Sequence, residues 1–203
     1  MRCSKAAIML QDRRLADKII KEARSRGVTL MQVLDTHVIP LNTKVLITSR
    51  SDLKEPTHLT PVFVEDFTSV RAIIDKVIEV NAGKKKIREV TISIDPGKRM
   101  GVAFIADGVI IRTANYTDYN NLISDILEFA NIHPTAQLNI VIGSGAGEYR
   151  DKLIEKINQQ FTDKSINIYL IPEHGSSHHG IKIKIDETAA LTFHKRFRKK
   201  LRR

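Results

Sequence analysis

Residues 90–111, VTISIDPGKRMGVAFIADGVII, decide the fold of the C-terminal half of the chain. Apolar residues alternate or run on in three short stretches, which indicates β-strands. The last two stretches are separated by Asp107-Gly108, a dipeptide typical of a two-residue hairpin turn. Asp95 ends the first stretch, and the Pro-Gly pair after it favours a tight turn. The strands are expected at Val90–Asp95, Gly101–Ala106 and Val109–Thr113.

The rest of this half alternates between helix and strand. Apolar residues at helical spacing, such as Leu122 and Ile126, indicate helices, and short apolar runs between them indicate buried strands. Three antiparallel strands are thus followed by helix, strand, helix, strand and a closing helix. The expected helices are Asp118–Asn131, Glu148–Phe161 and Asp186–Arg196, and the expected strands are Asn139–Gly143 and Asn167–Ile171.

Residues 1–82 predict a separate small α/β domain of the βαβ type with a mostly parallel sheet. A glycine followed by lysines at 83–86 marks an exposed linker, so a second domain is expected at 87–203. In the first domain the expected helices are Arg13–Arg26 and Phe67–Val80, the expected strands are Lys5–Leu10, Lys44–Thr48 and Pro61–Val64, and Val28–Leu34 fits a strand or a short helix.

The composition excludes several classes of protein. The chain has 203 residues, of which 42% are apolar, and Cys3 is its one cysteine. That excludes an internal disulfide and a cysteine-based zinc site, and it suits a reducing compartment. No apolar run approaches the ~20 residues of a membrane span, and the one near the N-terminus is too short for a signal peptide. We therefore expect a cytoplasmic protein with no membrane partner.

The net charge of +10 is concentrated in two segments. KRFRKKLRR at 195–203 holds seven cations and KKKIR at 84–88 holds four, so the remainder has a net charge of −1. Localised cations indicate a polyanionic partner, and nucleic acid fits better than an anionic membrane because the segment lacks an apolar helix face. A solvated, solubilising tail is the alternative. The expected contacts are Lys195, Arg196, Arg198, Lys199 and Lys200.

Two segments resemble the ribonuclease H-like superfamily, and within it the RuvC-like nucleases of the Holliday-junction resolvase branch. They are SIDPGKRMGVAFI at 93–105 and KIDETAALTF at 184–193, and the resemblance covers about 87–198. It implies a domain with a five-stranded mixed sheet, bound Mg²⁺ or Mn²⁺, and hydrolysis of phosphodiester bonds. Resolvases of this class act as dimers, so a homodimer is an expectation of the resemblance alone.

The resemblance implies three metal ligands that are also the catalytic residues. Asp95 ends the central strand and Asp186 begins the last helix, although the first also fits a turn cap and the second a helix N-cap. The family usually has an acid at the end of the fourth strand, where this chain has Gly143 and Ser144. Glu148 on the next helix is therefore the third candidate, unless it only stabilises the N-terminus of that helix.

The loop GSGAGE at 143–148 bears on this third ligand. Its glycines permit positive φ, which would let the loop fold tightly and bring Glu148 back toward the site. Backbone N–H groups of such a loop also favour a phosphate, but no Lys-Ser/Thr follows, so it is not a P-loop.

A second loop, PEHGSSHHG at 172–180, follows the fifth strand of this half. Its histidines are candidates for proton transfer, phosphate contact or metal binding, and ordinary loop residues are the alternative. The residues concerned are Glu173, His174, His178 and His179. Further backbone-phosphate contacts are expected from Lys98, Arg99, Lys182 and Lys184.

These observations predict a two-domain α/β protein whose C-terminal domain cleaves structured DNA, ahead of RNA, with Mg²⁺ or Mn²⁺. The alternative is the same fold without activity, which only binds nucleic acid, and the missing strand-end acid favours it. A phosphotransferase of the actin-like group is more remote, because it needs a second such domain and residues 1–82 show no phosphate loop.

Overall fold

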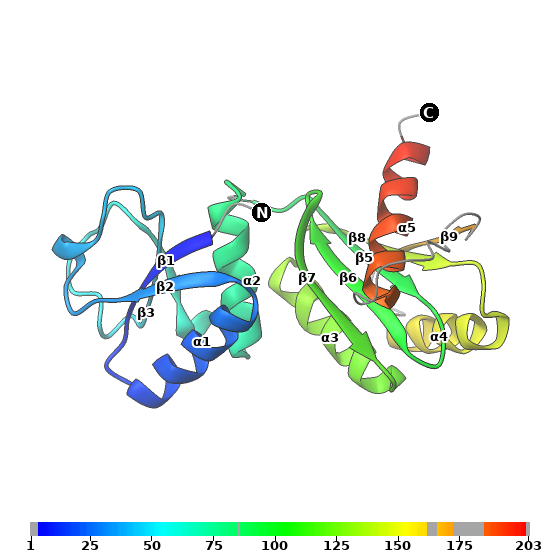
Figure 1. Cartoon of the computed structure of the whole chain (residues 1–203), viewed down its shortest axis with the longest axis horizontal. Coiled ribbons are helices and arrows are strands. Elements are labelled where there is room, and N and C mark those ends of the chain that lie inside the picture. The colour runs from blue at the N-terminus through cyan, green and yellow to red at the C-terminus, as the bar shows by residue number, and fades with distance from the viewer. Residues whose placement is uncertain (1–3, 85, 162–165, 173–184, 202–203) are drawn as a thin grey trace. The chain divides into compact units, whose positions relative to one another are not determined.

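The structure, a computed structural model, describes residues 4–84, 86–161, 166–172 and 185–201, and for 185–189, 200 and 201 it describes the backbone alone. The chain forms two compact units, Met1–Lys86 and Ile87–Arg203 (Figure 1). The division falls within the linker segment recognised in the sequence. Both units are α/β, as predicted.

The first unit contains a four-stranded parallel sheet with the order β2-β1-β3-β4. Helices α1 and α2 pack on one face of it, around Ile19, Ile47 and Ile74. Connecting segments cover the other face through Ile39 and Leu59. The elements are β1 (Ser4–Met9), α1 (Arg13–Ser25), β2 (Val28–Gln32), η1 (Thr36–Val38), β3 (Val45–Thr48), β4 (Thr60–Phe63), η2 (Val64–Asp66) and α2 (Val70–Asn81).

Short polar side chains fix where the helices of this unit begin. Asp12 accepts a hydrogen bond from the Leu15 amide at 3.0 Å and caps α1. Ser69 accepts one from the Ala72 amide at 3.1 Å and caps α2. The Ser69 cap explains why α2 begins three residues later than the apolar spacing predicted.

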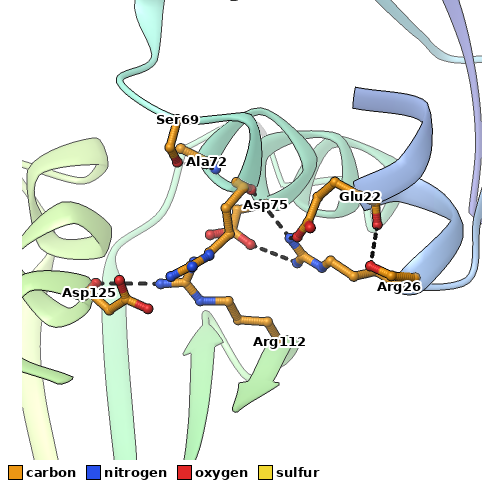
Figure 2. A network of polar contacts seen from close by, with 9 residues as sticks. Glu22, Arg26, Ser69, Ala72, Asp75, Arg112 and Asp125 are labelled. Atoms are coloured by element: carbon orange, nitrogen blue, oxygen red, sulfur yellow. Dashed lines mark hydrogen bonds and ion pairs between the residues drawn. The ribbon is translucent and has the colours of Figure 1, made fainter. Parts of the chain in front are cut away.

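Arg26, which follows α1, connects the two helices of the first unit (Figure 2). Its guanidinium donates to Asp75 Oδ1 at 2.7 Å and to the carbonyl of Arg71 at 3.3 Å. The Asp75 side chain is buried, so removal of one partner would leave an uncompensated charge in the interior. The ion pair thus holds α1 against α2.

The second unit contains a five-stranded mixed sheet with the order β7-β6-β5-β8-β9, which confirms the predicted sheet. β6 is antiparallel to β5 and β7, and β8 is parallel to β5 and β9. The elements are β5 (Glu89–Asp95), β6 (Met100–Ala106), β7 (Val109–Tyr116), α3 (Tyr119–Ile132), β8 (Gln137–Gly143), α4 (Gly147–Gln160), β9 (Ile166–Ile171) and α5 (Ile185–Leu201).

The turn between β6 and β7 has the chemistry that the sequence predicted. Asp107 and Gly108 have φ of 45° and 78°, and a two-residue turn of the type I′ requires positive φ at both positions. The Asp107 carboxylate also accepts hydrogen bonds from the amides of Arg88 and Glu89, at 3.0 and 2.9 Å. The hairpin is therefore anchored to the start of β5.

The two faces of this sheet carry different layers. Phe104 of β6 packs edge-on against Phe129 of α3, with ring centroids 5.3 Å apart, and α4 packs beside α3. Helix α5 covers the opposite face and packs on β5, β6 and β8 (Figure 1). There Val141 meets Phe193 and Phe197 of the helix. The central strands β5, β6 and β8 are thus buried between the two layers, whereas the edge strands β7 and β9 are partly exposed.

Helix α5 is longer than the sequence predicted. It was expected to end at Arg196, before a basic tail, but it continues to Leu201. The reason is tertiary: Phe197 is buried against the sheet, so the chain stays helical through most of the basic segment. Within the described part of the chain, no helix combines the length and the apolar character that crossing a bilayer requires.

Candidate functional site

Asp95 ends β5 on the face of the sheet that α5 covers. Alternate residues of a strand share a face, so Thr91, Ser93 and Asp95 lie on one side and the apolar residues between them on the other. Ser93 Oγ donates to the carbonyl of Ala190 in α5 at 2.5 Å, which identifies the polar side as the α5 side. Asp95 itself is half-buried.

A second contact gives the direction of α5. Arg198, about two turns beyond Ala190, pairs with Glu89 at the start of β5 at 3.0 Å, so the helix runs antiparallel to the strand. The four helix residues from Ala190 back to position 186 cover about 6 Å, and the two strand residues from Ser93 to Asp95 cover about 6.5 Å. The first turn of α5, which includes position 186, is therefore level with Asp95.

Glu148 does not take the strand-end position that the resemblance implies for a third acid. In the parallel β5–β8 pair Ile94 is opposite Ile142, so the next residue of β8, Gly143, brings no side chain to the end of β5. Glu148 is in the first turn of α4, its side chain is 78% exposed, and it accepts a hydrogen bond from Lys152 Nζ at 2.6 Å. This hydrogen bond and the charge of the ammonium group lower the pKa of the Glu148 carboxyl.

The predicted metal ligands therefore differ in how far the structure supports them. Among the side chains that the structure describes, no three of the types His, Cys, Asp and Glu gather to hold a cation. The side chain of Asp186 lies outside that description, so the triad of Asp95, Glu148 and Asp186 stays a prediction. Its donor set is made of carboxylate oxygens, which suits Mg²⁺ and Mn²⁺.

The loop before α4 is folded differently from the expectation. Its glycines were expected to supply positive φ, but among the described residues here the left-handed one is Ala146, with φ 47° and ψ 41°. The Ser144 amide is already bonded to the carbonyl of Ile171 at 3.0 Å, and Arg150 donates to the Ser144 carbonyl at 2.6 Å. The loop thus uses part of its backbone for internal bonds, which weakens the phosphate-cradle interpretation.

The expected nucleic-acid contacts fall into three groups. Lys98 and Arg99 are exposed on the turn directly after Asp95. Within α5, Lys195 and Lys199 are exposed. Arg196 donates to the carbonyl of Pro172 at 2.6 Å, and Arg198 pairs with Glu89. These two guanidinium groups therefore help to hold the helix in place. Outside the described side chains lie Glu173, His174, His178, His179, Lys182, Lys184 and Lys200.

Sequence reasoning missed His194, which lies in α5 and is only 8% exposed. Burial, and to a lesser degree the charge of Arg198, lower the pKa of His194 to about 4. Its imidazole is therefore neutral near pH 7. The sequence does contain a signal for its burial. His194 follows Phe193 and comes four residues after Ala190, so it lies on the apolar face that helical spacing predicts.

No family model matches the chain, and no curated protein sequence matches it at a significant level.

We expect Ala146→Gly to stabilise the protein by about 0.5–1 kcal/mol. A left-handed conformation costs an L-residue about 1–2 kcal/mol, and glycine avoids that cost while losing more entropy on folding. Urea unfolding measures the difference. Ala82→Gly is the control, because Ala82 has an ordinary φ of −76° and should show no gain. An equal gain in both variants, or a loss in Ala146→Gly, would contradict the assignment of strain to this loop.

His194 should make the protein less stable in mild acid. The unfolded chain protonates this histidine near pH 6.5 and the folded protein only near pH 4, so the unfolded state binds more protons between these values. Stability should fall by on the order of 1–2 kcal/mol as the pH is lowered through this window, less than the full shift because solvent reaches part of the ring. Urea unfolding at several pH values tests this, and His194→Gln should flatten the pH dependence. The same slope in both proteins would refute the assignment.

Proposed function

We propose that the second unit is a metal-dependent endonuclease of the ribonuclease H-like, RuvC-like kind, which hydrolyses phosphodiester bonds of structured DNA ahead of RNA. One observation carries the proposal: Asp95 ends the central strand on the face covered by α5, and the first turn of α5 is level with it. The element order supports it too, because three antiparallel strands, two helix–strand pairs and a closing helix are the order on which the resemblance rests.

Asp95 and Asp186 would hold Mg²⁺ or Mn²⁺, with Glu148 as the third ligand. When bound, two such ions activate a water molecule and stabilise the leaving oxygen of a phosphodiester. A carboxylate at the end of a rigid strand is positioned more accurately than one on a loop, which suits Asp95. Lys98 and Arg99 would contact the backbone beside the scissile phosphate, and such contacts position a strand without reading its sequence.

The second candidate is a nucleic-acid-binding protein of the same fold without activity. Two observations favour it: Gly143 stands at the end of β8, where a third carboxylate would be expected, and Lys152 engages Glu148. A homodimer belongs to the nuclease proposal through the resemblance to resolvases.

The Asp95→Asn variant separates the two candidates. We expect wild-type protein with Mg²⁺ or Mn²⁺ to cleave one or more of a four-way junction, a duplex and an RNA substrate. Asn keeps the size of Asp but removes the charge that a hard cation requires, so cleavage should fall by at least about a hundredfold while binding in EDTA persists. The control is Asp151→Asn, which neutralises an exposed carboxylate of α4. Equal cleavage by Asp95→Asn and wild type would leave only the binding protein.

Glu148→Gln tests whether the third carboxylate belongs to the site. If it binds metal, the concentration of Mn²⁺ needed for half-maximal cleavage should rise by about tenfold or more. Glu155→Gln, an exposed residue two turns along α4, is the matched control and should not change it. If Glu148→Gln behaves like Glu155→Gln, the role of Glu148 is limited to its pair with Lys152.

A further inference from the structure

An open pocket of about 530 Å³ lies between α5 and the β6–β7 hairpin. It extends from Leu191, near the middle of the sheet, to Arg198 and Gly108 at the end where β5 begins, whereas Asp95 ends β5 and is not among the lining residues. It is therefore separate from the proposed metal site. Its lining residues are Gly108, Ile110, Leu191, His194, Lys195, Arg198 and Lys199.

The lining combines a polar group without a partner and an apolar wall. His194 Nδ1 is buried and has no hydrogen-bond partner among the described residues, although buried polar groups are nearly always bonded. Because the imidazole is neutral near pH 7, it offers one donor and one acceptor. Ile110 is 49% exposed, and with Leu191 it gives the pocket an apolar side.

Cations lie around this apolar side. Lys195 and Lys199 are exposed, and no ion pair of either is found within the described residues. They are four positions apart on one helix face, with Cβ atoms about 6 Å from each other. Arg198 adds a third positive charge, partly used by its pair with Glu89. The positive charges suit anionic groups, and the apolar side of the pocket suits a flat, apolar group. A ligand that combines the two is therefore expected here.

We propose that this α5 pocket holds one unpaired base of a nucleic acid strand, whose flanking phosphates contact Lys195 and Lys199. The inference rests on the proposed function and narrows its substrate to nucleic acid with a single-stranded portion. The volume is within the range of pockets that take small ligands, so it admits a base and its sugar. His194 would bind the edge of the base, which is the usual way in which unpaired bases are recognised.

Binding of a dye-labelled single-stranded oligonucleotide, measured by anisotropy in EDTA, tests this proposal. The matched ligand has the same length but carries abasic spacers, so it keeps the phosphates and loses the bases. Wild-type protein should bind the intact strand about tenfold more tightly, a difference of about 1.4 kcal/mol. Ile110→Ser and His194→Gln should abolish this preference and leave abasic binding unchanged. Ile110 is partly exposed, so its replacement does not depend on repacking the core.

Charge is tested by the double variant Lys195→Glu with Lys199→Glu. It should weaken binding of both ligands and reduce the salt dependence by about one to two phosphate contacts. The control is Lys18→Glu with Lys21→Glu, the same change of charge on the exposed face of α1, and equal weakening there would overturn the proposal.

Three further outcomes are decisive. Equal affinity for intact and abasic strands would refute the binding of a base in the pocket, and it would not affect the nuclease proposal. Displacement of the oligonucleotide by poly-glutamate as effectively as by nucleic acid would identify an acidic protein partner instead. If wild-type protein binds neither strand, nor junction or duplex, the pocket and the proposed function both fail.

Discussion

The arrangement of the second unit depends on the packing of α5 against the polar face of β5. The hydrogen bond from Ser93 to the Ala190 carbonyl fixes the helix at mid-strand, and burial of Phe193 and Phe197 holds the rest of it. A buried hydroxyl without a partner would be costly, so helix and strand specify each other. The register that results brings the beginning of the helix to the end of the strand, where the only carboxylate of that strand end, Asp95, lies.

This arrangement divides the sheet into two ends with different chemistry. At the carboxyl end of β5 are Asp95 and the exposed Lys98, which suit a cation and a phosphate. At the other end Lys199 and the neutral His194 line the pocket between α5 and the β6–β7 hairpin. A nucleic acid strand that contacts both ends of the sheet would cross the face of α5. The basic segment is helical as far as Leu201, and the guanidinium groups of Arg196 and Arg198 stabilise the position of this helix.

Local chemistry explains what the sequence could predict. The three-stranded meander follows from period-two apolar spacing, and Asp107-Gly108 determines its turn through two positive φ values. The extent of α5 could not be predicted, because Phe197 becomes buried only once the sheet exists. The left-handed conformation of Ala146 could not be predicted, because the glycines beside it adopt positive φ more easily and were the expected positions for it. The spacing of four residues predicts the ion pair of Glu148 and Lys152. This pair gives Glu148 a role other than that of a metal ligand.

In the proposed site the end of β5 and the start of α5 share a divalent cation. Crystals of the whole chain grown with Mn²⁺ and measured at a wavelength where manganese scatters anomalously test it most directly. We expect an anomalous peak within coordination distance of carboxylate oxygens from both Asp95 and Asp186. Mn²⁺ bound elsewhere, or coordinates in which these two carboxylates face away from each other, would contradict it.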